Sequence, residues 1–481
     1  MKSIWNIGFS SSPKMLNKDL QDIDTVVIGA GMCGILTATF LAAKGQKIVV
    51  LEADRTGSGQ TVNTTAKITA QHGLFYSKMI KNHGIDSAAS YAEANQKAVE
   101  QYIDLASSLS ILCDMQILPA ALYTNSQDTN LEEEYLAAMS LGIDCVLQKG
   151  CSLPFRASSC LLFRNQAQFN PMPFLYKLAE NLTIYENSRV INVKEHNVIT
   201  EHGTISAANI VFATHYPFIN IPGFYFLRMH QERSYVIALE NADTLNAMYY
   251  GIDEDGLSFR NYNSLLLMGG FGHRTGKPDI GNPYRHLQKR ASQLWPNSKI
   301  VARWSAQDCV PIDNIPYIGR YSASRPYWYV ATGFKKWGMS TSMVAAGIIS
   351  DLILHGASEH ADIFAPDRKL SSYSYKNLGK EIGQATIGLS KTFLSYPLSG
   401  IDTISPGEAK IIHYKGRKIG VYKAPDGTVH PVSVKCPHLG CSLSWNPHDL
   451  SWDCPCHGSR FDYHGNLLDN PAQTSVHLHS H

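Results

Sequence analysis

The chain of 481 residues has little charge for its length. Charged residues make up 17% of it, against roughly 25% in an average protein. The hydrophobic fraction of 44% and the aromatic fraction of 10% are those of a folded chain, which excludes extensive disorder. There are 42 Lys and Arg against 40 Asp and Glu, so the formal net charge is +2. Without a basic excess, nucleic-acid binding is not expected.

The sequence also lacks an apolar segment long enough to cross a bilayer. The N-terminal residues MKSIWNIGFSSSPK contain no hydrophobic stretch of the kind found in signal peptides. The longest apolar helix candidate, residues 343–354, is too short for a span and contains Ser350 and Asp351. We therefore expect no membrane span and a cytoplasmic location. A chain of this length should form two or three domains.

The N-terminal region carries the pattern of a dinucleotide-binding unit. Residues 25–28 (TVVI) predict a buried strand, and Gly29, Gly31 and Gly34 follow as G-x-G-x-x-G before an apolar, Ala-rich helix. A second strand leads to Glu52, about 20 residues after the second glycine, where an acid is expected to bind the ribose hydroxyls. The glycines permit a tight turn, close approach of a pyrophosphate and close helix–sheet packing, and the helix N-terminus offers free N–H groups. The alternative is a glycine-rich turn in another α/β domain.

Later segments indicate which dinucleotide is bound. Residues 55–67 form a loop of small and hydroxyl-bearing side chains, which suits an extended flavin cofactor better than the regular βα unit of nicotinamide dehydrogenases. Residues 304–319 (WSAQDCVPIDNIPYIG) and 330–347 (VATGFKKWGMSTSMVAAG) strengthen the case. With these segments, residues 22–365 resemble the FAD-dependent D-amino-acid oxidase superfamily, which includes glycine oxidase and related deaminating flavoproteins.

This resemblance implies an α/β (α+β) fold, with an FAD-binding Rossmann-type part and an antiparallel substrate sheet. The implied FAD-binding part comprises residues 22–75, 180–220 and 300–360, and the substrate part mainly residues 76–179 and 221–299. In such proteins the last helix directs its N-terminus at the flavin, where backbone N–H groups stabilise negative charge on the reduced ring. The implied FAD contacts are Gly29, Gly31, Gly34, Glu52, Ser58, Gly59, Thr64, Thr65, Val190, Thr214, Gly333, Gly338, Met339 and Ser340.

The residues on the substrate side are less clearly marked. The arginine with which such proteins grip a substrate carboxylate has no match after Trp304. Hydride transfer to a flavin needs mainly positioning and a desolvated face, so no protein base has to appear. The candidates to face the flavin are Lys336, Trp337, His273, Arg260 and Arg274, and the alternative for each is a packing or surface role.

Four of the ten cysteines are crowded near the C-terminus. A chain this long gains little from a disulfide framework, so the crowding indicates a metal site. The pattern is Cys436-x-His438 and later Cys454-x-x-His457, so each loop supplies one Cys and one His. Zinc remains an alternative, although a zinc finger groups its cysteines together and its histidines together. The pattern suits a [2Fe-2S] cluster with the two cysteines on one iron and the two histidines on the other.

Residues 400–475 as a whole resemble Rieske proteins of the bc-complex type, which implies a small all-β domain. The resemblance also implies a disulfide, Cys441–Cys456, that joins the two cluster loops. It further implies hydrogen bonds from Ser459 and Tyr463 toward the cluster, which would raise its reduction potential. Since disulfides are disfavoured in the cytoplasm, this one should be buried, and two free thiols are the alternative.

The join between the two parts, residues 366–399, has a loosely helical pattern and predicts a helical connector that packs on the FAD part. The combination predicts an enzyme that oxidises a small amine or amino-acid-like substrate by hydride transfer to FAD. Electrons would then leave one at a time through the Rieske cluster to an external acceptor protein, or enter from a donor in the reverse direction. The alternatives are a flavin-dependent monooxygenase (hydroxylase) fed by the Rieske centre and a non-catalytic redox sensor.

Overall fold

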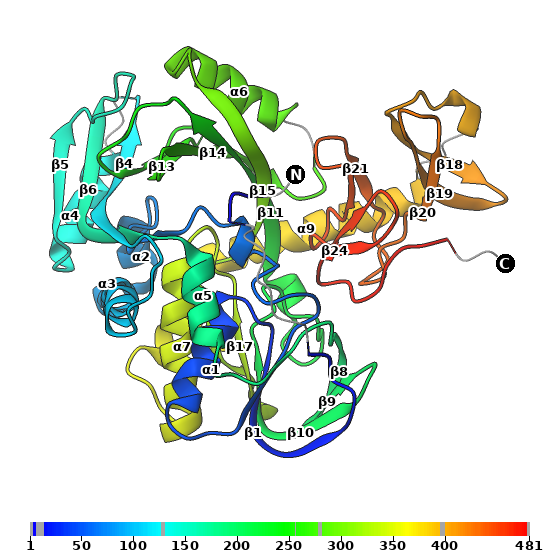
Figure 1. Cartoon of the computed structure of the whole chain (residues 1–481), viewed down its shortest axis with the longest axis horizontal. Coiled ribbons are helices and arrows are strands. Elements are labelled where there is room, and N and C mark those ends of the chain that lie inside the picture. Colours follow the sequence, from blue (N-terminus) through cyan, green and yellow to red (C-terminus); the bar gives the residue numbers. More distant parts are fainter. Residues whose placement is uncertain are drawn as a thin grey trace.

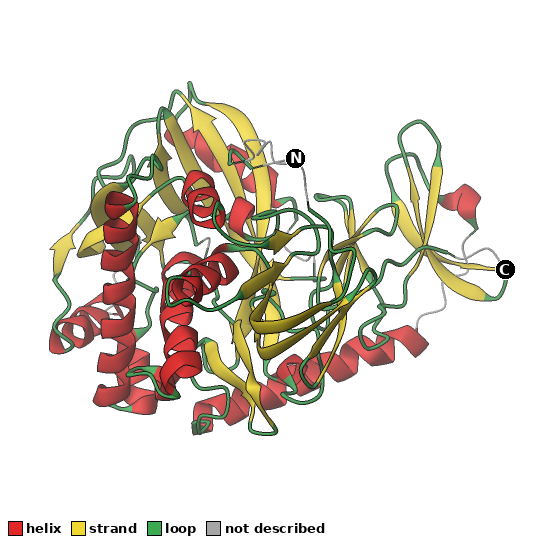
Figure 2. Ribbon diagram, turned by 60° about the horizontal axis from the view of Figure 1, so that its bottom comes forward, coloured by secondary structure: helices red, strands yellow, loops and turns green. Residues whose placement is uncertain are grey.

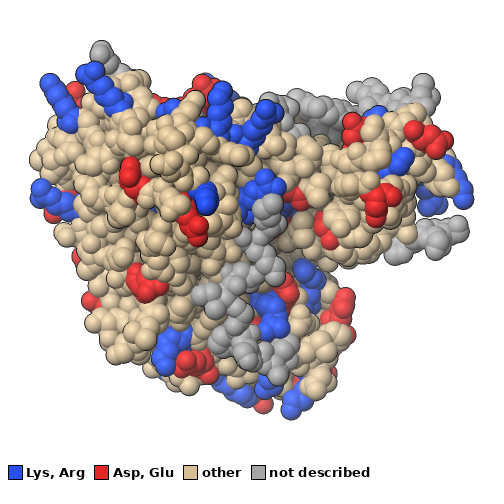
Figure 3. Space-filling view, turned by 45° about the horizontal axis from the view of Figure 1, so that its top comes forward, with Lys and Arg blue, Asp and Glu red and all other residues tan. Residues whose placement is uncertain are grey.

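The computed structural model describes residues 3–5, 14–126, 130–254, 256–277, 281–394 and 400–478. Two large sheets with their helices form the main body, and a smaller all-β domain projects from one side of it (Figure 1). On the face shown in Figure 3, basic and acidic side chains are interspersed rather than gathered by sign. This surface agrees with the near-neutral composition.

The first sheet is built on the N-terminal unit. Strand β1 (Leu20–Ile28) ends in a β-branched run and is parallel to both β2 (Ile48–Leu51) and β10 (Thr204–Phe212). The sheet has eight strands, and its main path is β16-β17-β10-β1-β2-β7. Its remaining strands are β7 (Ile184–Tyr185), β8 (Val190–Lys194), β9 (Asn197–Thr200), β16 (Tyr317–Ser322) and β17 (Arg325–Thr332). Its central strands are buried on both faces, as their continuous apolar sequence predicts.

Two apolar helices cover one side of this sheet. Helix α1 (Met32–Ala42) follows the glycine turn and packs against α7 (Gly338–His355). Helix α7 begins well before the predicted apolar segment 343–354, so it reaches 18 residues with a mean hydropathy of 1.2. That length and composition would allow a membrane span, but 67% of the helix is buried inside the protein. We therefore describe α7 as a core helix.

The second sheet has nine strands in the order β15-β11-β14-β13-β12-β4-β6-β3, with β5 paired to β6. All its pairings are antiparallel except that of β4 with β12, so the expected antiparallel sheet is present with one parallel exception. Its strands are β3 (Lys67–Ile68), β4 (Gln116–Thr124), β5 (Cys145–Lys149), β6 (Ser159–Gln168), β11 (Met229–Glu240), β12 (Met248–Gly251), β13 (Ser258–Tyr262), β14 (Leu265–Arg274) and β15 (Lys299–Pro311). Strands β3 and β15 belong to this sheet although their sequence segments were assigned to the FAD-binding part.

The main body contains further helices, which cover the two sheets and their edges. They are α2 (Tyr76–His83), α3 (Ile85–Ser108), α4 (Asn130–Ser140), α5 (Pro171–Ala179), α6 (Pro283–Leu294) and α8 (Ala361–Phe364), with 3-10 turns η1 (Thr61–Asn63) and η2 (Tyr225–Leu227). Asn170 and Asn282 cap α5 and α6 through their side chains, and a proline opens each helix. Both helices therefore begin where N-cap chemistry predicts a start.

The connector is helix α9 (Ser372–Leu394), as its periodicity predicts, while residues 395–399 lie outside the described part. Asn377 on α9 donates a hydrogen bond of 2.7 Å to the carbonyl of Ile312, and Glu381 forms an ion pair of 2.8 Å with Arg274. Figure 2 shows the helix running along the main body toward the small domain. Helix α9 thus packs on the main body before the chain enters the small domain.

The small domain contains two sheets. The first has β18 (Ala409–Tyr414), β19 (Arg417–Lys423) and β20 (Val429–Ser433), and the second has β21 (Ser444–Asn446), β22 (Ser451–Asp453), β23 (Arg460–Asp462) and β24 (Leu467–Asp469), with η3 (Ile401–Thr403) ahead of them. Gly416 and Gly427 mark the predicted hairpin turns. In Figure 1 the sheet of β18–β20 points away from the main body, whereas β21–β24 lie against it. The two cysteine-containing loops precede β21 and β23, at that boundary.

Candidate functional site

A cavity of about 460 Å³ opens at the carboxyl ends of β1 and β2. The glycine turn, the loop after Glu52 and the N-terminus of α7 line it. Crevices at the carboxyl ends of parallel strands are the usual ligand sites of such sheets. The cavity therefore lies where the sequence predicts the dinucleotide.

The glycine turn is shaped by close backbone approaches. Gly29 has φ +107°, and a Cβ on it would lie 2.5 Å from the carbonyl oxygen of Ala213, which directly follows the neighbouring strand β10. A Cβ on Gly34 would lie 1.9 Å from the carbonyl oxygen of Gly29, so α1 could not pack this closely on the turn with any other residue. Gly31 lines the cavity directly. The three glycines thus occupy positions consistent with a turn, a ligand approach and a helix contact.

Glu52 lies on the cavity wall at the end of β2. One carboxylate oxygen accepts a hydrogen bond of 2.8 Å from the N–H of Ala30, and the other accepts one of 2.9 Å from the N–H of Asp54. Burial raises the pKa of Glu52, while these two N–H donors oppose the shift. The side chain is thus fixed in place, and its remaining lone pairs can accept the hydroxyls of a ribose.

Most of the other implied FAD contacts also line the cavity. They are Gly29, Gly31, Glu52, Ser58, Gly59, Thr64, Val190, Thr214, Gly338 and Met339. The exceptions act around the cavity rather than on its wall. Gly34 packs α1 on the turn, the carbonyl of Thr65 accepts from Arg260, Gly333 has φ +77° in the turn after β17, and Ser340 bonds His72.

Sequence reasoning missed several wall residues. Gln60, Thr61, His215, Asp308 and Lys335 line the cavity, and so do Leu467, Leu468, Asp469, Asn470 and Gln473 of the small domain. The sequence predicts that the loop carrying Gln60 and Thr61 contacts the cofactor, but it does not single out these two residues. The small-domain residues carry no such signal, because only tertiary structure brings them to the cavity.

Charged side chains gather where the cavity meets α7. Lys335 and Lys336 line the cavity just before Trp337, the N-cap of α7, and burial lowers the pKa of Lys335 to about 8. The pKa of Lys336 is raised by its interaction with Tyr250 and by the Glu232 and Asp308 carboxylates, against the effect of burial. Burial raises the pKa of Asp308 to about 7. The protonation of Lys335 and Asp308 can therefore change when a charged ligand binds in the cavity.

Trp337 lies between these lysines and the helix, and its ring belongs to an aromatic cluster behind the cavity wall rather than to the wall itself. It stacks on His72, with ring centroids 4.9 Å apart and planes 15° apart, and Tyr250 meets it edge-on at 5.4 Å. The His72 ring nitrogens bond the hydroxyl of Tyr91 and the carbonyl of Thr69, at 2.7 and 2.8 Å. Burial lowers the pKa of His72 to about 3, so the imidazole is neutral.

Of the five candidates to face the flavin, Lys336 lines the cavity and Trp337 does not. The other three lie elsewhere, and this corrects the expectation for them. His273 is outside the cavity and bonds the hydroxyl of Tyr235 at 3.0 Å. Arg260 is fully buried and donates to the carbonyls of Thr65, Ala66 and Phe169, which satisfies it within the fold. Arg274 pairs with Glu381 of the connector. The sequence identifies these side chains as polar, but only the structure shows that each already has hydrogen-bond or ion-pair partners within the fold.

The two cysteine-containing loops bring four donor groups together. The thiols of Cys436 and Cys454 are hydrogen-bonded to each other, and the rings of His438 and His457 are 4.8 Å apart and nearly perpendicular. The Nδ1 atoms of both histidines are buried and have no hydrogen-bond partner among the described residues. Burial lowers the pKa of His438 to about 4 and of His457 to about 3, so both rings are neutral, as ligands must be. These unpartnered donors fit the predicted [2Fe-2S] cluster.

Hydrogen-bond donors surround the sulfur of Cys436. Hydrogen bonds from Cys454, from the N–H groups of His438 and Leu439 and from Ser459 lower the pKa of Cys436 against the effect of burial. Ser459 therefore lies beside the Cys436 sulfur, and its hydrogen bond toward a cluster stays a prediction. Such donors stabilise negative charge on sulfur.

Tyr463 does not follow its prediction. Its ring packs against Tyr422 at 5.3 Å and His430 at 5.1 Å, on the first sheet of the small domain. Strand β23 ends at Asp462, so Tyr463 belongs to the following turn and leaves the inward face to the fully buried Phe461. This placement argues against a hydrogen bond from Tyr463 to the cluster.

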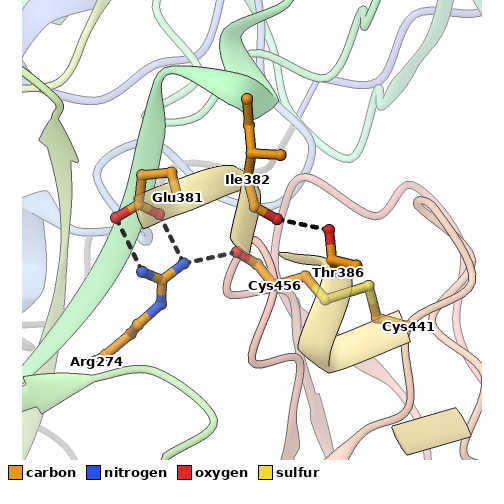
Figure 4. The surroundings of a disulfide bond; sticks show 6 residues. All are labelled: Arg274, Glu381, Ile382, Thr386, Cys441 and Cys456. Atoms are coloured by element: carbon orange, nitrogen blue, oxygen red, sulfur yellow. Dashed lines mark hydrogen bonds and ion pairs between the residues drawn. A yellow bond between two sulfur atoms is a disulfide. The ribbon is translucent and has the colours of Figure 1, made fainter. Parts of the chain in front are cut away.

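The predicted disulfide Cys441–Cys456 is present and buried. Arg274 donates to the carbonyl of Cys456 at 3.3 Å while it pairs with Glu381, so the disulfide loop, the main body and α9 meet there (Figure 4). The sulfur of Cys454 also lies within 4.8 Å of both disulfide sulfurs, but those two are bonded to each other and cannot act as thiolate ligands. The disulfide joins the two loops beside the donor group.

The histidine edge of the donor group faces the main body. His438 Nε2 is 2.8 Å from the side-chain oxygen of Asn220, and His457 is hydrogen-bonded to the backbone of Phe226. Gln231 donates to the carbonyl of His457 at 2.7 Å, and Gln307 donates to that of Gly458 at 2.8 Å. Since Gln307 also lines the dinucleotide cavity, the two sites adjoin.

Comparisons with known proteins agree with both sites. Residues 24–352 match the family model described as FAD dependent oxidoreductase, and residues 395–480 match that of the Rieske [2Fe-2S] domain. The Bacillus subtilis protein named "Putative Rieske 2Fe-2S iron-sulfur protein YhfW" is 35% identical over 468 residues, which cover 94% of this chain and 92% of that protein. "Probable oxidoreductase OrdL" of Haemophilus influenzae is 25% identical over 398 residues, which cover 76% of this chain and 91% of that protein.

Solved structures share the fold of the main body. L-proline dehydrogenase from P. horikoshii superimposes with a TM-score of 0.62 at 16% identity, covering 74% of this chain and 98% of that one. Glycine oxidase from Geobacillus kaustophilus gives a TM-score of 0.61 at 16% identity, covering 74% and 100%. At this identity the likeness concerns the fold alone.

Proposed function

Because the chain belongs to the FAD dependent oxidoreductase family and ends in a Rieske [2Fe-2S] domain, we propose that it oxidises a small amine or amino-acid-like substrate by hydride transfer to FAD. The electrons then pass one at a time through the iron–sulfur cluster to an external acceptor protein. The observation that carries this proposal is that the two sites adjoin: Gln307 lines the dinucleotide cavity and donates to the carbonyl of Gly458, next to His457.

The chain's residues have distinct tasks in this proposal. The glycine turn and Glu52 would hold the dinucleotide, and the first-turn N–H groups of α7, which line the same cavity, would stabilise negative charge on it. Cys436, Cys454, His438 and His457 hold the cluster. When bound, FAD supplies a two-electron acceptor and the cluster a one-electron carrier, so together they convert a two-electron oxidation into single-electron exits.

Positive charge near the flavin side supports a substrate with an acidic group. Burial, together with the positive charges of Arg260 and Lys336, lowers the pKa of Lys67 to about 7. These three cationic side chains repel one another, and a bound carboxylate would offset that repulsion. Lys336 lines the cavity, so it is the residue we assign to substrate positioning. Trp337 packs on His72 and Tyr250 next to it. We propose that this oxidation takes place in the cytoplasm.

An anaerobic experiment tests the proposal. Amines and amino acids are mixed with the loaded protein, and flavin bleaching and the cluster's EPR signal are followed in the same sample. A substrate should bleach the flavin, and the EPR signal of the reduced cluster should then appear. Reduction with dithionite is the control that shows a competent cluster. Flavin bleaching with a cluster that stays silent, although dithionite reduces it, would refute the relay.

A further inference from the structure

We propose that the small domain is part of the FAD site: its residues 467–473 wall the dinucleotide cavity, and docking of the domain retains the dinucleotide. This assigns to the Rieske domain a binding task separate from electron transfer. The inference rests on FAD binding and not on the identity of the substrate or on the direction of electron flow.

The cavity wall comes from both parts of the chain. Leu467, Leu468, Asp469, Asn470 and Gln473 line the same cavity as the glycine turn and the α7 N-terminus. They come from β24 and the loop after it, on the side of the small domain that lies against the main body in Figure 1. A dinucleotide in this cavity would therefore meet the small domain directly.

The small domain also fastens the main-body segments that form the cavity. The amide of Asn470 donates to the carbonyls of Thr214 and Tyr216, at 2.8 and 2.7 Å. The amide of Gln60 donates to the carboxylate of Asp469 at 2.8 Å. Thr214 and Gln60 both line the cavity. Undocking of the small domain would therefore free the two segments that carry them and would also remove the part of the wall that the small domain supplies.

The interface offers a position that separates docking from direct contact with the dinucleotide. Gly276 follows β14, does not line the cavity and has φ +76°. A Cβ on it would lie 2.5 Å from the backbone nitrogen of Pro455 and 2.6 Å from its Cα. Backbone atoms cannot move aside as a flexible side chain would, so Gly276→Ala should wedge the two parts apart.

The release rate of FAD measures this effect. Holoprotein is diluted, and the rise of flavin fluorescence gives the rate, while the absorption spectrum of the cluster reports whether the small domain is intact. We expect Gly276→Ala and Asn470→Ala each to release FAD at least about tenfold faster than the unaltered chain, a change of about 1.4 kcal/mol. Gly256→Ala is the matched control, because Gly256 also has a positive φ but has no atom within 4 Å of its Cβ position. Its release rate should stay near that of the unaltered chain.

Reciprocity supplies a second measurement on the unaltered chain. If docking tightens FAD binding, FAD must tighten docking by the same factor. Hydrogen exchange of the amides in residues 467–473 should therefore slow when FAD is added to the flavin-free protein that still holds its cluster. Unchanged exchange in this segment, or release rates of both variants within twofold of the unaltered chain, would overturn the proposal.

Discussion

The substitution Arg233→Met should weaken docking of the small domain more than any surface change. Arg233 of β11 is almost fully buried and forms an ion pair of 2.6 Å with Asp449 of the small domain. Arg460 in turn pairs with Asp449, Asp453 and Asp469, at 3.3, 3.1 and 2.9 Å. Three carboxylates thus share two guanidinium groups. Methionine keeps much of the volume of Arg233 but leaves one buried and two partly buried carboxylates with a single cation.

The size of the effect follows from this charge balance. Removal of one partner of a buried ion pair costs about 3–5 kcal/mol. The pKa of Asp449 gives a second estimate of this free energy. Burial raises it, but Arg233 and Arg460 together lower it to about 2, against about 3.9 in an unfolded chain. At about 1.4 kcal/mol per pKa unit, this amounts to about 2–3 kcal/mol, which agrees in order of magnitude.

Urea unfolding of the small domain, followed by its cluster absorption, measures the loss. We expect the midpoint of Arg233→Met to fall by about 1 M or more at pH 7. Because the pKa of Asp449 is lowered by folding, its contribution is present above pH 4 and disappears as the pH falls toward 2. The variant should lose stability at a higher pH than the unaltered chain, since its carboxylate has lost one cation.

A double-mutant cycle with Asp449→Asn decides whether the ion pair is responsible. The double variant Arg233→Met, Asp449→Asn should recover part of the stability, because it removes one of the unpaired carboxylates. If Arg233→Met has the midpoint of the unaltered chain, or if the two substitutions are additive, the charge-balance reasoning is wrong.

Three further outcomes are expected. Lys336→Met should slow anaerobic flavin bleaching by the substrate about tenfold or more while Lys336→Arg slows it less, and an unchanged rate in stopped-flow absorption would contradict its assignment. Cys441→Ala should lose its cluster faster in air, as followed by absorbance, because the loops are no longer joined; full retention would count against that task for the disulfide. Glu381→Gln removes the charge that Arg274 and His230 share, so the thermal midpoint should fall by an amount equivalent to about 1–3 kcal/mol, and an unchanged midpoint would show that this clamp is not stabilising.

Both cofactor sites could be recognised from the sequence because the residues that form them lie close together along the chain, at characteristic spacings. The turn of Gly29 to Gly34, the acid at Glu52 and the two loops with one Cys and one His each need only local chain geometry. The disulfide Cys441–Cys456 followed from a resemblance to a known kind of protein and is present in the structure.

The contacts between the sites could not be predicted in this way. The bond of Asn220 to His438 joins residues 218 positions apart, and that of Gln60 to Asp469 joins residues 409 positions apart. Nothing in the local sequence distinguishes these amides from solvated ones. Arg260 was misplaced for a related reason, since only the fold reveals the three carbonyls that satisfy it.

The connector α9 has a kinetic consequence. As one chain, the two cofactor sites are present at a fixed and high effective concentration, which two separate proteins would reach only at high expression. Any exchange between the sites is therefore a first-order process, independent of protein concentration. Only the encounters with substrate and with an external redox partner remain second-order, so dilution of the protein would slow those encounters and leave the internal step unchanged.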